Sequence, residues 1–130
     1  MTTAIPVDQY CVLGHPVEHS LSPRIQNRFA ELTGQHLTYT RQLVPLDGFD
    51  AALDALRAQG VRGCNVTLPF KHQAYAYARK HGQLSARAEL AQACNLLDFS
   101  ADSIFADNTD GVGLVQDLRA NAGYELAGRD

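Results

Sequence analysis

The segment that most constrains the fold is a short β-branched strand running directly into a proline turn, the sequence GCNVTLPFK at 63–71. Pro69 has no backbone N–H and disfavours helical geometry at Leu68, so the strand has to end there. A helical pattern follows the turn, which leaves Thr67 and Lys71 at the carboxyl end of the strand. Open α/β sheets bind ligands at that end of their strands. The segment is equally compatible with a strand, a proline turn and a solvated lysine.

The rest of the chain alternates between strand-like and helix-like patterns. We expect strands at residues 10–13, 37–44, 64–67, 94–99 and 103–106, and helices at 23–33, 48–59, 73–80, 86–91 and from 110 onward. This order predicts an α/β fold, a three-layer α/β sandwich with helices on both faces of a mostly parallel, mixed sheet of about six strands. A tight polar turn at 100–102 joins the last two strands, so one strand is expected to be antiparallel.

Capping residues mark several of the helix starts. Ser22 is expected to be the N-cap of the first helix, with Pro23 at its first position. Asp47 is expected to cap the second helix and Ser85 the fourth. The last helix is expected to bury the apolar side chains of Val112, Val115 and Leu118.

Composition and charge narrow the class of protein. The 130 residues are the size of one domain, and 45% hydrophobic with 19% charged residues is typical of a globular protein. The net charge of −3 gives no electrostatic reason to expect nucleic acid or an acidic membrane as a partner. No apolar run approaches the roughly 18 residues of a membrane span, and no signal-peptide pattern opens the chain. We therefore expect a cytoplasmic protein without nucleic-acid or membrane partners.

The cysteines and histidines do not form a metal-binding pattern. Cys11, Cys64 and Cys94 are widely spaced, and each lies in an apolar, strand-like run. Such residues are typical of reduced thiols in a core. His15 and His19 have no spacing that indicates a metal site, and we expect them to be solvated.

Four loops at strand ends hold polar groups that could carry chemistry. Ser20 and Ser22 precede a helix, whose free N–H groups and positive end can bind a carboxylate, although capping alone also explains Ser22. Thr67 and Lys71 form the second group. Asn95 lies in an apolar strand pattern, where its amide needs either protein partners or a ligand.

The fourth group is the sequence DNTDG at 107–111, which precedes the last helix. It can be pure capping and turn chemistry, and its carboxylates lack the spacing of a calcium loop. The following G-V-G at 111–113 lacks the third glycine of a dinucleotide-binding loop. We therefore expect no cofactor loop in this chain.

Taken together and in this order, four segments closely resemble the substrate-binding domain of shikimate dehydrogenase. They are GHPVEHSLSP at 14–23, NVTLPFK at 65–71, ACN at 93–95 and DNTDG at 107–111. The resemblance implies that residues 1–130 form one substrate-binding, catalytic domain of this family. It also implies that the NADP-binding Rossmann domain is absent from this chain, so that the chain alone is inactive.

The family is an oxidoreductase family that reduces 3-dehydroshikimate to shikimate with NADPH, on the chorismate route to the aromatic amino acids. By motif position, the residues implied to bind the substrate are Ser20, Ser22, Thr67, Lys71, Asn95 and Asp110. Ser20 and Ser22 would hold the carboxylate and the others the ring hydroxyls, with Lys71 and Asp110 as the catalytic pair. Ketone reduction leaves an alkoxide that needs a proton, and a lysine ammonium beside a carboxylate can supply it.

The sequence departs from the family around the asparagine. The family usually has GAVNT, whereas residues 92–96 here read QACNL. Gln92 adds bulk and Leu96 removes a hydroxyl, so the placement of Asn95 is in question.

Two other functions stay open. One is a quinate or quinate/shikimate dehydrogenase of the same family, which shares these motifs. The other is a non-catalytic module that binds a hydroxylated cyclohexane carboxylate. Retention of both Lys71 and Asp110 argues against the second, because a pure binder does not need a proton-transfer pair. The sequence predicts no oligomeric state.

Overall fold

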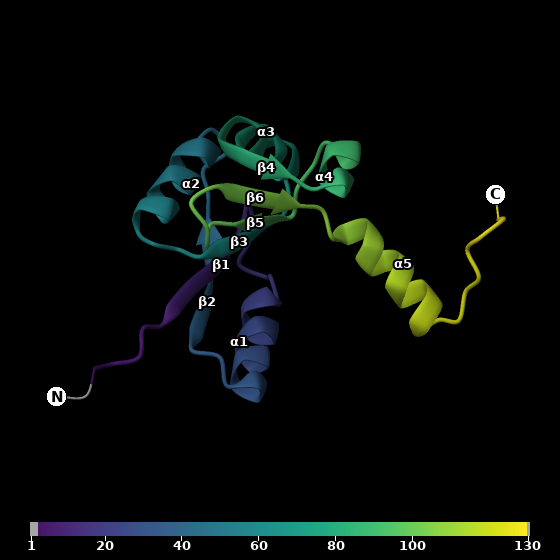
Figure 1. The fold of residues 1–130 in the computed structure, drawn as a ribbon, viewed down its shortest axis with the longest axis horizontal. Coiled ribbons are helices and arrows are strands. Elements are labelled where there is room, and N and C mark those ends of the chain that lie inside the picture. The colour runs from purple at the N-terminus through teal and green to yellow at the C-terminus, as the bar shows by residue number, and fades with distance from the viewer. Residues whose placement is uncertain (1–2, 130) are drawn as a thin grey trace.

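The computed structural model describes residues 3–129 and is built around one sheet of six strands in the order β2-β1-β3-β5-β6-β4 (Figure 1). The strands are β1 (Asp8–Gly14), β2 (Leu37–Leu43), β3 (Gly63–Val66), β4 (Gly82–Leu84), β5 (Leu96–Asp98) and β6 (Ile104–Asp107). The helices are α1 (Ser22–Thr33), α2 (Phe49–Ala58), α3 (Lys71–His81), α4 (Ala86–Ala91) and α5 (Asp110–Ala120).

The sheet is mixed, with a single antiparallel strand among those described. β1 pairs in parallel with β2 and β3, and β4 pairs in parallel with β6. β5 runs antiparallel to both of its neighbours, β3 and β6. The predicted mostly parallel sheet with one antiparallel strand is therefore confirmed. Because β5 is reversed, its start lies at the same edge of the sheet as the ends of β3 and β6.

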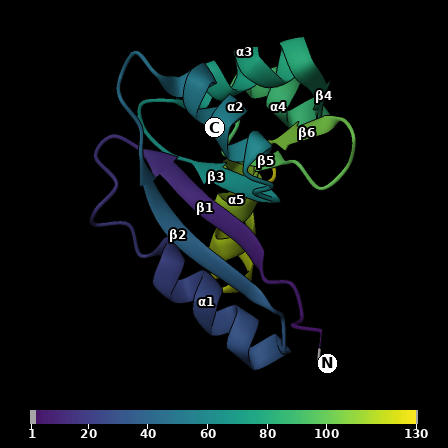
Figure 2. The same cartoon turned by 90° about the vertical axis from the view of Figure 1, so that its left-hand side faces the viewer.

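Helices cover both faces of the sheet, as predicted, with α1 on the opposite side from α2, α3 and α4 (Figure 2). Along β1, alternate side chains point to opposite faces. Cys11 and Leu13 join the main core, which also contains side chains of α2 and α3. Val12 points the other way, into a smaller cluster with Val17 and Tyr39. The three cysteines are buried, as predicted.

The short strand β4 is not among the strands expected from the sequence. A Cβ atom at position 82 would lie 2.1 Å from the carbonyl oxygen of Ile104 in β6. The glycine therefore ends α3 and also lets this strand approach its neighbour closely.

Two of the three predicted N-caps are wrong. Leu21 is the N-cap of α1, and Ser22 is the first residue of the helix. The backbone N–H of Ser22 donates instead to Oγ of Ser20, at 3.3 Å. Asp47 does not cap α2, which starts from Gly48 without a side-chain cap.

The third predicted cap is confirmed. Oγ of Ser85 accepts a hydrogen bond from the N–H of Ala88, at 3.1 Å, and α4 starts at the following residue as expected. Capping of this kind satisfies one of the backbone donors that a helix leaves free at its start.

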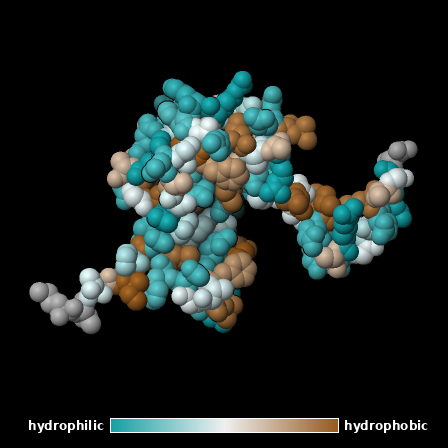
Figure 3. Space-filling view, in the orientation of Figure 1, coloured by the Kyte–Doolittle hydropathy of each residue, from teal (hydrophilic) through white to brown (hydrophobic). Residues whose placement is uncertain are grey.

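The predicted burial of the last helix is wrong. α5 extends away from the rest of the chain (Figure 1), and Val112 and Val115 are 45% and 39% exposed. Leu118 is half-buried. Apolar surface runs along this helix in the space-filling view (Figure 3). The sequence spacing correctly indicates an apolar helix face, but residues 3–129 contain no element that covers it.

Candidate active site

The structure brings all six predicted site residues to one cavity of about 510 Å³. They are Ser20, Ser22, Thr67, Lys71, Asn95 and Asp110. Ser20 lies in the loop after β1, and Thr67 directly follows β3. Asn95 directly precedes the reversed β5, and the other three are the first residues of helices, Ser22 of α1, Lys71 of α3 and Asp110 of α5. The reversal of β5 is what places Asn95 at the same edge as the strand ends. The carbonyl of Asn95 accepts from the N–H of Val66 at 2.9 Å, which fixes this alignment.

Lys71 and Asp110 form an ion pair at this cavity. The Nζ atom of Lys71 lies 2.7 Å from Oδ2 of Asp110. Lys71 is the first residue of α3, where the positive end of the helix disfavours a cation. Asp110 is the first residue of α5, where a carboxylate is favoured. The ion pair therefore offsets the unfavourable position of the lysine and holds its ammonium group beside the cavity.

Asn95 lies just before β5 rather than inside a strand, and its side chain is held within the protein. Its Oδ1 accepts from the N–H of Thr109 at 2.8 Å. Its Nδ2 donates to Oγ1 of Thr109 at 2.8 Å and to Oδ1 of Asp110 at 3.1 Å. Asn95 therefore fixes the position of the Asp110 carboxylate as well as lining the cavity. Its contact with a substrate stays a prediction.

The unusual residues around Asn95 do not reach the cavity. Gln92 is exposed and has φ 51°, the left-handed conformation that favours glycine. Its carbonyl oxygen lies 2.9 Å from Nδ1 of His72, which holds the turn in place. Leu96 lines a separate hollow with Tyr10 and Tyr39. Neither side chain is a hydrogen-bond partner of the Asn95 side chain, whose bonds go to Thr109 and Asp110.

The serine loop is tied to the edge strand β2 by a residue that the sequence did not indicate. Nε of Arg41 donates to the carbonyl oxygen of Ser20 at 3.1 Å, and its Nη2 donates to the same oxygen. Of the two histidines expected to be solvated, His19 is exposed and also lines the cavity. His15 is exposed as well, with Nδ1 2.8 Å from the carbonyl oxygen of Val44.

Asn65 of β3 also lines the cavity and was missed as a site residue. Its Nδ2 donates to the carbonyl oxygen of Asn95, at 3.2 Å. The sequence held a signal for it, because side chains two apart in a strand point to the same face. The assignment of Thr67 to the site could therefore have indicated Asn65 as well.

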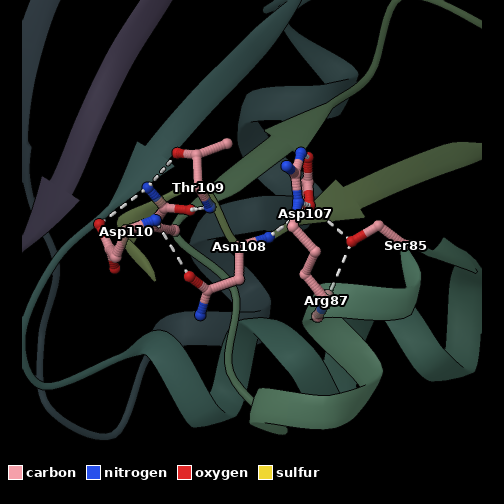
Figure 4. A network of polar contacts seen from close by, with 8 residues as sticks. Ser85, Arg87, Asp107, Asn108, Thr109 and Asp110 are labelled. Carbon is pink, nitrogen blue, oxygen red and sulfur yellow. Dashed lines mark hydrogen bonds and ion pairs between the residues drawn. The ribbon is translucent and has the colours of Figure 1, made fainter. Parts of the chain in front are cut away.

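The DNTDG segment is anchored by Asp107, which is only 7% exposed (Figure 4). Arg87 donates to both oxygens of its carboxylate, and Ser85 donates to Oδ1. These contacts, above all the hydrogen bonds from Arg87, lower the pKa of Asp107 to about 2. Asn108 then accepts from the N–H of Asp110 at 3.1 Å. The segment is therefore both turn chemistry, as one interpretation expected, and the support that positions Asp110.

The described residues do not fit a dinucleotide. Gly111 and Gly113 lie within α5 rather than in a loop between a strand and a helix, so they do not form the glycine-rich loop of a dinucleotide-binding motif. Within residues 3–129, no cluster of three or more His, Cys, Asp or Glu side chains could hold a metal ion. None of the described helices combines the length and hydropathy of a membrane span.

Comparison with known proteins finds similarity to shikimate dehydrogenases along the part of the chain that forms this site. The family model described as shikimate dehydrogenase substrate binding domain matches residues 12–97. The curated shikimate dehydrogenase (NADP(+)) of Paracidovorax citrulli is 59% identical over 131 residues, covering 100% of this chain and 46% of that protein. The chain spans less than half the length of the curated relatives that it matches.

Solved structures agree in fold. Shikimate 5-dehydrogenase from Thermus thermophilus in complex with shikimate is 33% identical with a TM-score of 0.84, over 95% of this chain and 46% of that one. The Listeria monocytogenes enzyme in complex with shikimate and NAD is 28% identical with a TM-score of 0.85, over 99% of this chain and 44% of that one.

Proposed function

The chain belongs to the shikimate dehydrogenase substrate-binding domain family, and from that premise we propose that it is the substrate-binding half of an NADP-dependent shikimate dehydrogenase. The proposed reaction is the reversible reduction of 3-dehydroshikimate to shikimate. We place this reaction on the chorismate route to the aromatic amino acids and in the cytoplasm.

One observation supports the proposal above all: the Lys71–Asp110 pair and the hydroxyls of Ser20 and Ser22 line the same cavity. Its volume of about 510 Å³ falls within the range of about 300–1,000 Å³ that is usual for small-molecule sites. Lys71 and Asp110 come from the starts of α3 and α5, and Ser20 and Ser22 come from the loop before α1 and its first residue. A ligand with a carboxylate at one end and hydroxyls on a ring matches this distribution of polar groups.

The carboxylate end is best matched by the serine loop. Ser20 and Ser22 offer two hydroxyl donors beside the first turn of α1, where the helix presents its positive end. Hydrogen bonds to an ionised group are roughly twice as strong as those between neutral groups. We therefore assign the substrate carboxylate to these two residues, and the ring hydroxyls to Thr67, Asn95 and the catalytic pair.

Lys71 is proposed to hold the transferred proton at Nζ. Reduction of a ketone places negative charge on its oxygen, and an ammonium group in contact with that oxygen stabilises the charge and donates a proton. The Asp110 carboxylate, whose Oδ2 lies 2.7 Å from Nζ, restricts the position of the lysine head group. In the reverse direction the same nitrogen receives the proton of the alcohol.

NADP is proposed to bind to a Rossmann domain outside this chain, because the described residues do not fit the cofactor. The exposed apolar face of α5 supports a further domain packing there. On this proposal residues 1–130 act as one substrate-binding domain, and their partners are shikimate or 3-dehydroshikimate and the cofactor domain.

The test is the NADP-dependent oxidation of shikimate and of quinate by the chain joined to a cofactor domain of its family. We expect turnover with shikimate, and its loss when Lys71→Ala is introduced. Turnover with quinate alone would assign the enzyme to the quinate dehydrogenases. Binding of shikimate without turnover, in a chimera that binds NADP, would indicate the non-catalytic module instead.

A further inference from the structure

Tyr39 of β2 is a buried residue to which neither the sequence motifs nor the proposed reaction gives a role. Its side chain is only 6% exposed, and its hydroxyl donates to Oδ1 of Asn65 at 2.7 Å. Burial raises the pKa of the Tyr39 phenol above its usual range, so the hydroxyl stays protonated and remains a donor. The phenol therefore reaches from the edge strand β2 across β1 to a residue that lines the cavity.

The backbone of Tyr39 is fixed from both sides. On one side it pairs with Tyr10 of β1. On the other side the carboxamide of Asn27 in α1 acts as a substitute strand partner: its Nδ2 donates to the carbonyl of Tyr39, and its Oδ1 accepts from the N–H, both at 2.9 Å. A side chain on so constrained a backbone can hold a neighbouring group in one orientation.

The group that it holds is the carboxamide of Asn65. With Oδ1 facing the phenol, Nδ2 faces the carbonyl oxygen of Asn95, at 3.2 Å. Nδ2 carries two hydrogens, and only one is needed for this bond. The second N–H makes no hydrogen bond within residues 3–129, and Asn65 lines both this cavity and the neighbouring hollow.

The same bonds link Tyr39 to the ion pair. Asn65 donates to the carbonyl of Asn95, and the side chain of Asn95 donates to Asp110, which accepts from Lys71. Hydrogen bonds therefore link Tyr39 to Asn65, Asn65 to the backbone of Asn95, and the side chain of Asn95 to the ion pair at the cavity. Chains of this kind hold their members more rigidly than separate pairs do.

We propose that Tyr39 is a positioning residue, whose hydroxyl holds the Asn65 carboxamide so that an N–H donor faces the cavity. The ligand that this donor selects is one with an oxygen acceptor, such as a ring hydroxyl. The choice of shikimate as that ligand rests on the proposed function, whereas the orientation of Asn65 does not.

The orientation is tested without any ligand, by NMR of the ¹⁵N-labelled chain. In Tyr39→Phe, which keeps the ring and removes the hydroxyl, we expect the side-chain amide signals of Asn65 to shift. The signals of Asn27 are expected to stay, because its bonds go to the backbone of residue 39. Tyr10→Phe is the matched control, since the hydroxyl of Tyr10 makes no hydrogen bond within residues 3–129 and its ring packs in the same cluster. Unchanged Asn65 signals in a folded Tyr39→Phe chain would overturn the proposal.

A second measurement covers the case in which Tyr39→Phe does not fold. In the unaltered chain, the hydroxyl proton of Tyr39 is expected to exchange slowly with water and to show cross-relaxation to the amide protons of Asn65. Rapid exchange, or cross-relaxation to other groups only, would overturn the proposal.

The affinity of the variants for shikimate then shows whether Tyr39 acts by positioning Asn65 or by a general effect on the structure. Tyr39→Phe is expected to weaken binding about three- to tenfold, the range for one neutral hydrogen bond. In the Asn65→Ala background the same substitution is expected to have little further effect. An equal loss in both backgrounds would show that Tyr39 does not act through Asn65. If shikimate binds neither to the unaltered chain nor to the chain joined to a cofactor domain, the proposed function fails, and the NMR measurements still decide the orientation of Asn65.

Discussion

Nζ of Lys71 lies 2.7 Å from Oδ2 of Asp110, although 39 positions separate the two residues along the chain. Each is the first residue of a helix, and these helices follow β3 and β6. Those two strands are not adjacent, because β5 lies between them. The reversed β5 starts at this edge and supplies Asn95, which donates to the same carboxylate. The order β3-β5-β6 therefore brings the first residues of α3 and α5 together, and this allows the ion pair to form.

Replacing Lys71 with alanine in the complete enzyme should lower kcat about 10²- to 10⁴-fold, the usual contribution of a general acid. KM for shikimate should change much less, because the serine loop and the remaining polar groups still bind the substrate. Steady-state kinetics with shikimate and NADP measures both constants. Lys80→Ala, in the exposed last turn of the same helix, is the matched control and should leave both unchanged. A large rise in KM with kcat unchanged would contradict the role of Lys71 in proton transfer.

Removing the hydroxyl of Ser20 should weaken shikimate binding about tenfold or more, since a hydrogen bond to a charged group is lost. For an analogue in which the carboxylate is replaced by a neutral group, Ser20→Ala should change the affinity only slightly. Calorimetric titration with both ligands measures this difference, and Ser103→Ala, in the exposed turn before β6, serves as the control. Equal losses of affinity for both ligands would place the carboxylate elsewhere in the cavity.

Asp107 should make the stability of the fold depend on pH. Its pKa is about 2 in the folded chain, whereas an unperturbed aspartate has a pKa of about 3.9. The unfolded chain therefore takes up this proton first on acidification, and the free energy of unfolding falls as the pH drops from about 5 to about 2. Urea unfolding across this range measures the slope.

Asp107→Asn tests the assignment of that slope. The substitution breaks the contacts with Arg87 and should lower the free energy of unfolding by about 1–3 kcal/mol near neutral pH. The difference between the two proteins should shrink toward pH 2, where the carboxyl group of the unaltered chain is also protonated. A constant difference across the pH range would mean that another group causes the acid sensitivity.

Gln92→Gly should stabilise the chain by up to about 1 kcal/mol, because glycine adopts the left-handed conformation without strain. Gln92 has φ 51° at the end of α4, whereas Gln59 has φ −78° at the end of α2. Gln59→Gly is therefore the matched control, and it should destabilise the chain. Urea midpoints of the two variants give the comparison. Destabilisation by Gln92→Gly would show that the Gln92 side chain stabilises the fold by more free energy than the left-handed backbone conformation costs.

The sequence allowed much of this site to be predicted, for identifiable reasons. Strand ends, a proline turn and polar loops before helices are local signals, and they placed Ser20, Thr67 and Asp110 after strands. Their selection as site residues came from the resemblance to the family motifs, and the structure brings them to one cavity. The hairpin turn at 100–102 revealed that one strand is reversed, and that reversal brings Asn95 into the cavity.

Other features depend on contacts that no local pattern encodes. Arg41 and Tyr39 reach the site from the edge strand β2, and their role is visible only once β2 is placed beside β1. Ser22 has the residue type of an N-cap, yet the geometry of the loop gives the hydrogen bond to Ser20. The apolar face of α5 was recognised, but periodicity says nothing about what covers such a face.

The central claim is that the cavity between the serine loop and the Lys71–Asp110 pair binds shikimate, and calorimetric titration of shikimate tests it most directly. The account predicts binding by residues 1–130, weakened in Ser20→Ala. If the chain alone shows no heat, the same titration is made with the chain joined to a cofactor domain, which completes the edge of the site. Saturable binding there that Ser20→Ala weakens would support the claim, with the site requiring both domains. No binding in either form, or binding that Ser20→Ala and Lys71→Ala both leave unchanged, would contradict it.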